Sequence, residues 1–446
     1  MPPRNARGRT HPVRIRTFPP AAPIRNPCWR CKLIYGNPFA AFGQILSRMW
    51  MNYIKIAWRN LTRNKMFSII NILGLAIGIA ASLLILQYVS NELGYDRFHG
   101  KADRIYRLSQ QRMDEENNYS TDWAAGTFGV GTHFKNEFPE IESVVKLVKA
   151  SPLLLSVQGR SGEGVRIEQA FWTTPSFLQV FSVPLIHGDA KSVLTEPHTL
   201  LLSESVARKL FGTEDPVGKT VLRNQGRAFR VVGVYRDLPE NSHIHPQTLT
   251  SFSTFVKDAE SPGLETTWTW DGCLTYLLLR PGTAPSALEA KFPATVKRLA
   301  KMPDGTPVHV AYSLLPLTDI HLYSHRRMEA EPNGDGNTVY LLLGIALFII
   351  VIAWINYINL ATARALNRAV EVGVRKAVGS QRSQLILQFL FESALLNALA
   401  VGLALLIISA ALPVFNDISG QDLSLSLFRS TTFWLALGAL YLTGSL

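Results

Sequence analysis

One stretch of this sequence, rich in glycine and charged residues, has a pattern that could bind a ligand. Residues 212–220 read GTEDPVGKT, which looks like a phosphate-binding loop. That loop needs four residues between its first glycine and its Gly-Lys pair, whereas five separate Gly212 from Gly218. A helical pattern also precedes the string, where the loop requires a strand. We therefore predict a turn at Asp215 and Pro216 and no nucleotide site.

Histidine and cysteine pairs are the other candidate ligands. His243 and His245 flank a single residue, so alternate positions of a strand would put both imidazoles on one face, where a metal ion could bind. Cys28 and Cys31 have the spacing of half a zinc or redox site. The sequence offers neither pair an assured further ligand. We therefore favour core or surface roles for the histidines and no metal or redox role for the cysteines.

No other residues form a constellation typical of catalysis. The sequence has no nucleophile elbow, no HExxH string and no carboxylate pair placed for acid–base work. Trp268 and Trp270 could line a binding groove, although packing is the default role of such aromatic residues. The sequence therefore predicts no enzymatic activity, no cofactor and no metal site.

The composition favours a membrane protein. Of the 446 residues, 47% are hydrophobic and 17% are charged, below the roughly 25% charged residues of soluble domains. The hydrophobic residues gather in long uncharged runs, as a bilayer requires. The net charge of +12 would suit nucleic acid if it lay on one folded face, but many basic residues lie at the N-terminus or beside the apolar runs. Orientation in a membrane explains them better, and no nucleic-acid partner is predicted.

The predicted fold class is an integral membrane α-helical protein with four spans, the last incomplete, and a large α+β periplasmic domain inserted between spans 1 and 2. In chain order we expect a disordered or non-native N-terminal extension at 1–50, an interfacial amphipathic helix at 51–66, span 1 at 67–90, the periplasmic domain at 91–337, span 2 at 338–363, a cytoplasmic segment at 364–384, span 3 at 385–412, a periplasmic loop at 413–430 and a truncated span 4 at 431–446. The fourth run holds about 16 residues, short of the roughly 20 that a span needs, so we expect a truncated product.

Basic residues beside the spans predict the orientation. Before span 1 and after span 2, basic side chains far outnumber acids: Lys55, Arg59, Arg63 and Lys65 in the first flank, and Arg364, Arg368, Arg375, Lys376 and Arg382 in the second. Because lysine and arginine are retained inside, both flanks are expected in the cytoplasm. The N-terminus is then cytoplasmic and the large insert lies outside.

The insert reads as a mixture of strands and helices. Strand-like stretches lie at 153–157, 165–168, 229–235 and 274–279, and the stretches 203–211 and 286–301 read as helices. Its length of roughly 245 residues allows two lobes.

A stripe of small residues marks span 1. Gly74, Gly78 and Ser82 fall four apart, which predicts a smooth side where another helix backbone packs closely.

The segment after span 2 has the most specific pattern of the chain. Its middle is a basic helix in which Gly373 and Gly379 allow close backbone approach, and Arg375 and Lys376 could pair with acids on a partner. A topology anchor would need the charges but no particular order of residues. We therefore interpret the segment as a short rigid helix that receives a push.

Three strings give the chain a strong resemblance to the MacB and FtsX family of ABC transporter permeases with a MacB-like periplasmic core domain. They are NYIKIAWRNLTRNKMFSIINILGLAIGIA near the start of span 1, FRVVGVYRDLPENSH in the insert and EVGVRKAVG at 371–379. The resemblance covers nearly all of 51–446 and implies a bacterial inner membrane protein. It implies a coupling helix that docks on a separate ABC ATPase subunit and contains Glu371, Gly373, Val374, Arg375, Lys376 and Gly379.

The resemblance also implies how such a protein works. ATP-driven closure would move the helices and transmit force to the periplasmic domains without a substrate tunnel, in a dimer of permease halves surrounded by lipid. A periplasmic adaptor or another periplasmic protein is a candidate further partner. Small-molecule or peptide efflux, lipoprotein extraction and control of a cell-wall enzyme stay open. A membrane-anchored periplasmic ligand sensor is the alternative from another class, and a membrane-bound hydrolase is a weaker one.

Overall fold

The computed structural model describes residues 52, 54–63, 65–114, 119–159, 164–190, 192–224, 226–260, 263–363, 365–421, 423 and 431–445. The predicted extension at 1–50, with Cys28 and Cys31, lies outside these residues. The chain divides into two compact units, Met1–Ile56 and Ala57–Leu446, and the second unit contains the elements discussed below. Within the predicted amphipathic segment, residues 54–63 are helical.

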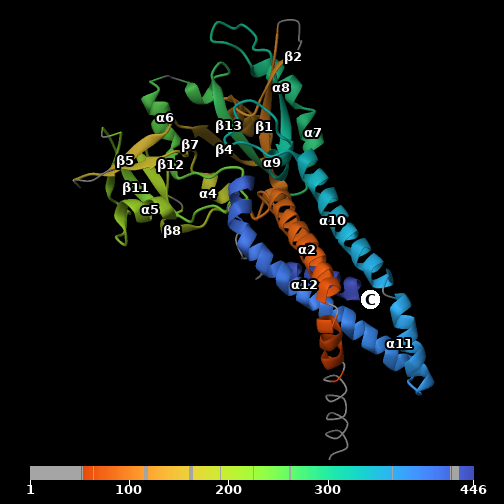
Figure 1. Ribbon diagram of the computed structural model, residues 1–446. Helices are drawn as coiled ribbons and strands as arrows, with labels where there is room; N and C mark the ends of the chain where they lie inside the picture. Colours follow the sequence, from red (N-terminus) through yellow and green to blue (C-terminus); the bar gives the residue numbers. More distant parts are fainter. Residues whose placement is uncertain are drawn as a thin grey trace, which may run out of the picture. The chain divides into compact units, whose positions relative to one another are not determined.

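Long apolar helices make up one part of the second unit (Figure 1). In the described residues, three helices are long and apolar enough to cross a membrane: α2 (Lys65–Leu93), α10 (Gly336–Ala363) and α12 (Arg382–Ser419). Helix α2 packs against both α10 and α12. The apolar helix α13 (Thr431–Ser445) is shorter and packs against α12. Between α10 and α12 lies α11 (Ala365–Ala377).

Helix α12 differs from the prediction at its C-terminal end. The sequence analysis ended span 3 at residue 412 and began a loop at Pro413, whereas α12 continues through that proline to Ser419. Apolar helices in a bilayer tolerate proline because neighbouring groups satisfy the freed backbone. The helix ends instead at Gly420, whose φ of 68° gives the left-handed conformation typical of a glycine cap.

The region between α2 and α10 is built on one mixed sheet. Its main path runs β14-β1-β13-β4-β7-β12-β9-β11-β10-β5-β6, with β2 beside β1, β3 beside β13 and β8 beside β11. Most pairs are antiparallel, but β11 pairs with β9 and β12 with β7 in parallel. The strands are β1 (Ile105–Met113), β2 (Tyr119–Trp123), β3 (Gly126–Thr127), β4 (Ile141–Lys149), β5 (Leu153–Val157), β6 (Val165–Ile167), β7 (Ala170–Thr173), β8 (Leu185–Gly188), β9 (Thr199–Ser203), β10 (Thr220–Arg223), β11 (Arg227–Tyr235), β12 (Thr248–Ser251), β13 (Asp271–Leu279) and β14 (Val310–Pro316).

Short helices cover the sheet at both ends. They are α3 (Val130–Glu137), α4 (Phe177–Val180), α5 (Glu204–Phe211), α6 (Phe252–Asp258), α7 (Pro285–Glu289), α8 (Phe292–Leu299) and α9 (Ile320–Tyr323). The single helix predicted at 286–301 is two helices, α7 and α8, and Pro293 lies in the first turn of the second. Proline fits a first turn because its missing N–H has no partner there.

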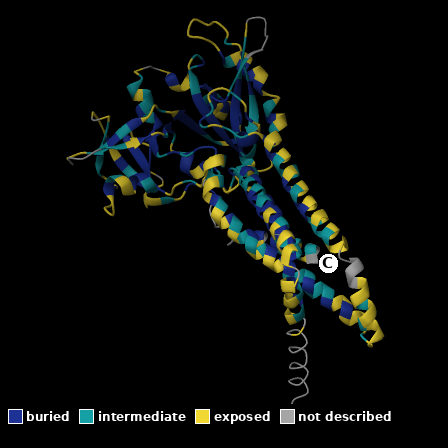
Figure 2. Ribbon diagram, in the orientation of Figure 1, coloured by how far each residue is buried: buried dark blue, intermediate teal, exposed yellow. Residues whose placement is uncertain are grey.

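Three hydrophobic cores follow the sheet. One lies at the β1 and α8 end around Phe134 and Phe292, and another at the β5 and α6 end around Phe229 and Phe252. A central core around Phe181 and Tyr276 joins them. Figure 2 shows buried residues running through the strands, with exposed residues along the outer faces of the long helices. The domain therefore has two lobes on one sheet.

Candidate functional site

Helix α11 carries an internal ion pair that also ties it to α12. Arg375 donates to the Glu371 carboxylate one turn earlier at 2.5 Å and to Gln388 Oε1 of α12 at 2.6 Å. Pairs four residues apart stabilise a helix modestly, whereas the link between two helices fixes their relative position. Arg375 is thus engaged within its own chain, while the neighbouring Lys376 is exposed.

The turn after α11 is a Schellman motif. The amide of Gly379 donates to the Lys376 carbonyl at 3.0 Å, and the amide of Ser380 donates to the Arg375 carbonyl at 3.0 Å. Gly379 has a φ of 97°, which an L side chain rarely adopts. Gln381 then caps α12 in a capping box with Gln384. Helices α11 and α12 therefore form a hairpin with a defined corner.

One face of this hairpin is apolar and uncovered. Val370, Val374 and Val378, at intervals of four residues, are 71%, 60% and 82% exposed. A Cβ placed on Gly373 would meet no atom within 4 Å, so the described residues of this chain do not make the close approach predicted there. We call Val370, Gly373, Val374 and Val378 the valine stripe. An exposed apolar stripe beside a basic residue is the kind of surface that a partner protein covers.

The small residues of α2 face α10. A Cβ placed on Gly78 would lie 2.7 Å from Ala353 Cβ, and one on Gly74 would lie 3.2 Å from Asn356 Nδ2. Ser82 Oγ donates to the Ala346 carbonyl at 3.0 Å. The two helix backbones come close along this line because the α2 side chains there are minimal.

A buried polar cluster joins the end of α2 to the sheet domain. The Glu92 carboxylate accepts from His321 Nε2 of α9 at 2.9 Å and from the side-chain amide of Gln421, which follows α12. Asn91 Nδ2 donates to Gln421 Oε1 at 3.0 Å. The Tyr95 ring stacks on His321 with centroids 3.4 Å apart. This cluster thus joins the C-terminal end of α2, the residue Gln421 just after α12, and the sheet domain.

Gly334 brings a third long helix to the same point. It lies two residues before α10, and a Cβ placed on it would be 2.7 Å from Glu92 Oε2 and 2.9 Å from His321 Nε2. No side chain fits at that position without moving the pair. The ends of α2, α10 and α12 therefore meet at one hydrogen-bonded contact with α9, which we call the junction cluster: Glu92, Tyr95, His321, Gly334 and Gln421.

A second buried network fixes the chain that follows α2. The Asp96 carboxylate accepts from His243 Nδ1 at 2.8 Å, and His243 Nε2 lies 2.8 Å from the Tyr276 hydroxyl of β13. Burial alone would raise the pKa of Asp96, but the His243 imidazole and its hydrogen bonds outweigh burial and hold that pKa well below its usual range. Asp96 is therefore a carboxylate, which locks this turn onto the central core.

The histidine pair has the core and surface roles that the sequence favoured, and the shared strand face that a metal site would have needed is not formed. Residues 236–247 contain no strand, and the two imidazoles have different partners. His243 is buried between Asp96 and Tyr276, whereas His245 Nδ1 lies 2.8 Å from Glu331 Oε2. Across the described residues, no group of three or more His, Cys, Asp or Glu side chains is placed to hold a metal.

The loop-like string at 212–220 and the tryptophan pair have structural roles. The stretch 212–219 is a turn after α5, in which Lys219 pairs with Glu214 at 2.5 Å. Trp268 is buried and stacks on His133, with centroids 4.9 Å apart, while Trp270 is 52% exposed. Trp268 therefore has the packing role that is the default for such residues.

Sequence reasoning missed the junction cluster. Glu92 and His321 are 229 residues apart, so no local spacing points to their contact. One signal was present: Glu92 is the charge that ends the uncharged run of span 1. Nothing in the sequence around Asp96, Gly334 or Gln421 pointed to their contacts.

Comparison with known protein families finds two matches along the chain. Residues 68–295 match the MacB-like periplasmic core domain, and residues 343–445 match the FtsX-like permease C-terminal region. The first match alone covers more than half of the chain, and the resemblance inferred from the sequence is confirmed.

Individual relatives agree with these matches. The ABC transporter permease YvrN of Bacillus subtilis (strain 168) is 22% identical over 367 residues, which cover 78% of this chain and 84% of the relative. The macrolide export ATP-binding/permease protein MacB of Wolinella succinogenes is 23% identical over 412 residues, which cover 88% of this chain and 57% of the relative. The match to MacB of Bdellovibrio bacteriovorus covers 31% of that relative. The matches thus span 31% and 57% of the length of these two MacB proteins.

Solved structures are also similar. A permease domain from Porphyromonas gingivalis is 25% identical with a TM-score of 0.44, covering 55% of this chain and 98% of that domain. The periplasmic region of MacB from Actinobacillus actinomycetemcomitans is 16% identical with a TM-score of 0.34, covering 50% of this chain and 92% of that region.

Proposed function

Because the chain belongs to the family of ABC transporter permeases with a MacB-like periplasmic core domain and an FtsX-like C-terminal region, we propose that it couples ATP hydrolysis on a separate ATPase subunit to movement of its periplasmic domain. The work done outside is export or mechanotransmission. The ATPase would bind the cytoplasmic hairpin of α11 and α12, and the long helices would relay the movement.

The observation that carries this proposal is the valine stripe. Three exposed valines and the open Gly373 lie beside the exposed Lys376 on α11. Burying such side chains against a partner would remove about 25 cal/mol of unfavourable free energy per Å² of apolar surface. Lys376 could pair with an acid on the ATPase at the rim of the contact, whereas Arg375 holds the hairpin in shape. Glu371, Arg375 and Gly379 thus act as positioning residues in this proposal.

A route from the stripe to the periplasmic domain supports the same proposal. Arg375 links α11 to α12 through Gln388. Helix α2 packs on α10 and α12, and its end is bonded to His321 at the junction cluster. A shift of the hairpin would therefore reach the sheet domain through hydrogen-bonded contacts. Flexible linkers would not transmit such a shift.

The basic flanks support the orientation that the proposal needs. Lys55, Arg59 and Lys376 would face the cytoplasm of a bacterial inner membrane, with the sheet domain in the periplasm. A dimer of permease halves, bilayer lipid and a periplasmic adaptor complete the proposed assembly. This arrangement predicts no nucleotide bound by the chain itself.

Stimulation of the cognate ATPase tests the proposal directly. The full chain and its ATPase are reconstituted in lipid nanodiscs, and ATP hydrolysis is compared for the wild type, Val374→Asp, and the double variant Arg375→Glu with Lys376→Glu. Both variants are expected to abolish stimulation while the chain still inserts. Lys297→Glu, an exposed charge reversal on α8, serves as the control.

Two results would contradict the proposal. One is unaltered stimulation in Val374→Asp, since an aspartate cannot be buried in an apolar contact without a large cost. The other is labelling of a cysteine at Val378 from the periplasmic side, which would put the stripe on the wrong face of the membrane.

A further inference from the structure

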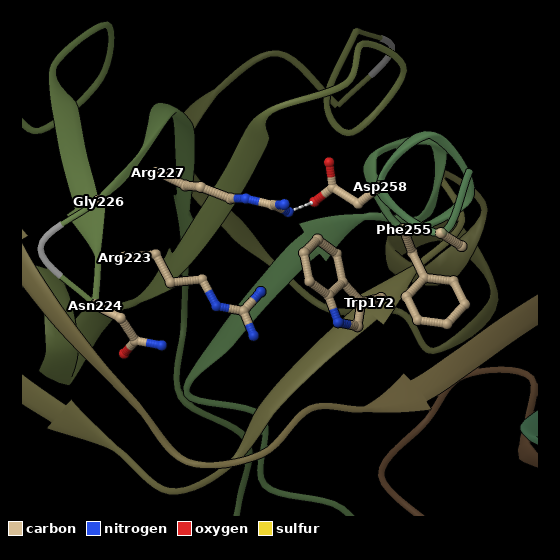
Figure 3. A pocket seen from close by; sticks show the side chains of 8 residues that line it. Trp172, Arg223, Asn224, Gly226, Arg227, Phe255 and Asp258 are labelled. Carbon is tan, nitrogen blue, oxygen red and sulfur yellow. Dashed lines mark hydrogen bonds and ion pairs between the residues drawn. The ribbon is translucent and has the colours of Figure 1, made fainter.

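One lobe of the sheet domain contains an open cavity that the coupling proposal does not use. It lies between the β10–β11 turn, β7 and α6, has a volume of about 550 Å³, and is lined by Trp172, Arg223, Asn224, Gly226, Arg227, Phe255, Asp258 and Ala259. That volume lies within the roughly 300–1,000 Å³ range of small-molecule sites. Figure 3 shows the aromatic rings and the guanidinium groups of this cavity together.

Two aromatic side chains supply an apolar wall. Trp172 is 7% exposed, and its ring lies 6.0 Å from that of Phe255. Phe255 in turn stacks on Phe128, with centroids 5.4 Å apart, so the wall is part of the packed core of this lobe. A flat apolar body would find a preformed surface here.

Arg223 supplies a positive charge without an acid. Its guanidinium carbon lies 4.7 Å from the Trp172 ring centroid. Within the described part of the chain, its guanidinium makes no hydrogen bond or ion pair. Burial and the neighbouring Arg227 lower the pKa of Arg223, and the charge of Asp258 opposes them only in part. The guanidinium thus lies beside the aromatic wall, and its N–H groups are available to a ligand.

Two neighbours define the rest of the cavity. Arg227 is paired with Asp258 of α6, so its charge is balanced (Figure 3). The Asn224 side-chain Oδ1 accepts from the Leu154 backbone amide at 2.9 Å, and the Asn224 backbone amide donates to the Leu154 carbonyl at 2.8 Å. The β10–β11 turn is therefore held by β5. The lining as a whole carries one uncompensated positive charge.

We propose that this cavity binds a small organic carboxylate with a flat apolar body, the carboxylate on Arg223 and the body against Trp172 and Phe255. A carboxylate matches the N–H fork of arginine in a bidentate pair, which neither a neutral group nor a cation does. A cavity of about 550 Å³ has room for a small molecule and not for a folded partner. This inference is independent of the coupling role, since the cavity shares no residue with α11 or the junction cluster.

A fluorinated probe tests the site on the whole protein. The full chain in nanodiscs of zwitterionic lipid is titrated with 6-fluoronaphthalene-2-carboxylate and, separately, with its neutral carboxamide. Binding is read from ¹⁹F line broadening after subtraction of empty nanodiscs. We expect saturable binding of the carboxylate with a dissociation constant of about 1 mM or tighter, and binding of the carboxamide at least about tenfold weaker.

Variants assign the binding to the cavity. Arg223→Gln is expected to weaken carboxylate binding by about tenfold or more. Asp258→Asn is expected to strengthen it, because Arg227 then loses its internal partner. Arg230→Gln is the control, since this arginine of β11 pairs with Glu196 outside the cavity, and the affinity should not change.

The outcomes are decisive in both directions. Absence of saturable broadening, equal affinity for the carboxylate and the carboxamide, or equal affinity in Arg223→Gln and the wild type each overturns the proposal. If Arg223→Gln does not fold, the comparison of the two probes on the wild type still decides it. Failure of this test leaves ATPase stimulation unaffected, so it is distinguishable from failure of the coupling role.

Discussion

Glu92 at the end of α2 and His321 on α9 form a buried hydrogen bond of 2.9 Å across 229 residues of sequence. Their side chains are 4% and 8% exposed. The bond joins an apolar helix to the sheet domain at the point where Gly334 leads into α10. Movement of the helices relative to the domain must therefore break, shift or transmit through this contact.

Replacing His321 with phenylalanine tests the importance of that contact. The variant keeps an aromatic ring for Tyr95 but removes the donor to Glu92. We expect the free energy of unfolding to fall by about 1–3 kcal/mol, because Glu92 loses a partner in a buried place. The measurement is unfolding by denaturing detergent, with hydrogen exchange of residues 92–99 as a local readout.

The control for this prediction is His325→Phe, an exposed histidine four residues further on. It should leave both measurements unchanged. If His321→Phe were as stable as the wild type, the junction cluster would not be a rigid link. ATPase stimulation should persist in His321→Phe, since the valine stripe is untouched, while the periplasmic domain no longer follows the helices.

The contact between Gly78 and Ala353 predicts a size limit at the α2–α10 interface. A Cβ on residue 78 would lie 2.7 Å from Ala353 Cβ, closer than two carbon atoms approach without displacement. Gly78→Ala is expected to cost about 1–3 kcal/mol of stability through overpacking. Ala353→Gly in the same chain should restore much of that loss, because it removes the opposing methyl group.

Gly402→Ala is the matched control for this interface. It also adds a methyl group to a long apolar helix, but no atom lies within 4 Å of the added carbon. Stability should be unchanged or slightly higher, since alanine favours helix over glycine. Equal losses in Gly78→Ala and Gly402→Ala would contradict the interface.

The sequence predicted the elements whose pattern is local. The strand-like stretch 153–157 coincides with β5, and the uncharged runs coincide with α2 and α10. Helix ends were harder: Pro293 divides a predicted helix because it starts a new one, whereas Pro413 does not interrupt α12. A proline gives the same local signal in both places, and the surrounding structure decides whether the helix ends there.

The candidate sites divide in the same way. Residues 371–379 could be selected because their order is specific within one helix. The junction cluster could not, since its members come together through the sheet topology. His243 shows the difference: a core role was among those predicted, but its partner Asp96 is 147 residues away, so no spacing could point to that contact.

His245 predicts a pH dependence near neutrality. Burial alone would lower its pKa, but the hydrogen bond to Glu331 and the charge of that carboxylate outweigh burial and raise the pKa. A histidine whose pKa is raised by folding stabilises the fold fully below its unfolded pKa of about 6.5, and this contribution is lost as the pH rises through the folded pKa. The stability that depends on His245 should therefore be larger at pH 6 than at pH 8.

The comparison of His245→Gln with the wild type isolates this effect from other titrations. The difference in Tm between them should shrink from pH 6 to pH 8, and Glu331→Gln should behave in the same way. A difference that grows with pH would mean that the neutral imidazole is the form that the fold prefers.

Alanine substitutions at Gly379 and Gly373 are expected to have opposite effects on hydrogen exchange in α11. Gly379 has a φ of 97°, so Gly379→Ala is expected to strain the corner by about 1 kcal/mol and to increase hydrogen exchange in α11. Gly373→Ala should decrease that exchange, because alanine stabilises a helix interior by about 1 kcal/mol relative to glycine. Gly344→Ala in α10, where the added carbon also meets no described atom within 4 Å, is the control and should leave hydrogen exchange in α11 unchanged.

Measuring ATPase stimulation for the same variants separates the stability of the hairpin from its docking surface. If α11 needed only to be rigid, Gly373→Ala would stimulate the ATPase at least as well as the wild type. If a partner backbone packs against Gly373, the added methyl group lowers stimulation although α11 is more stable. We expect the second result, because the glycine lies within the valine stripe and no atom of the described residues lies within 4 Å of a Cβ placed there.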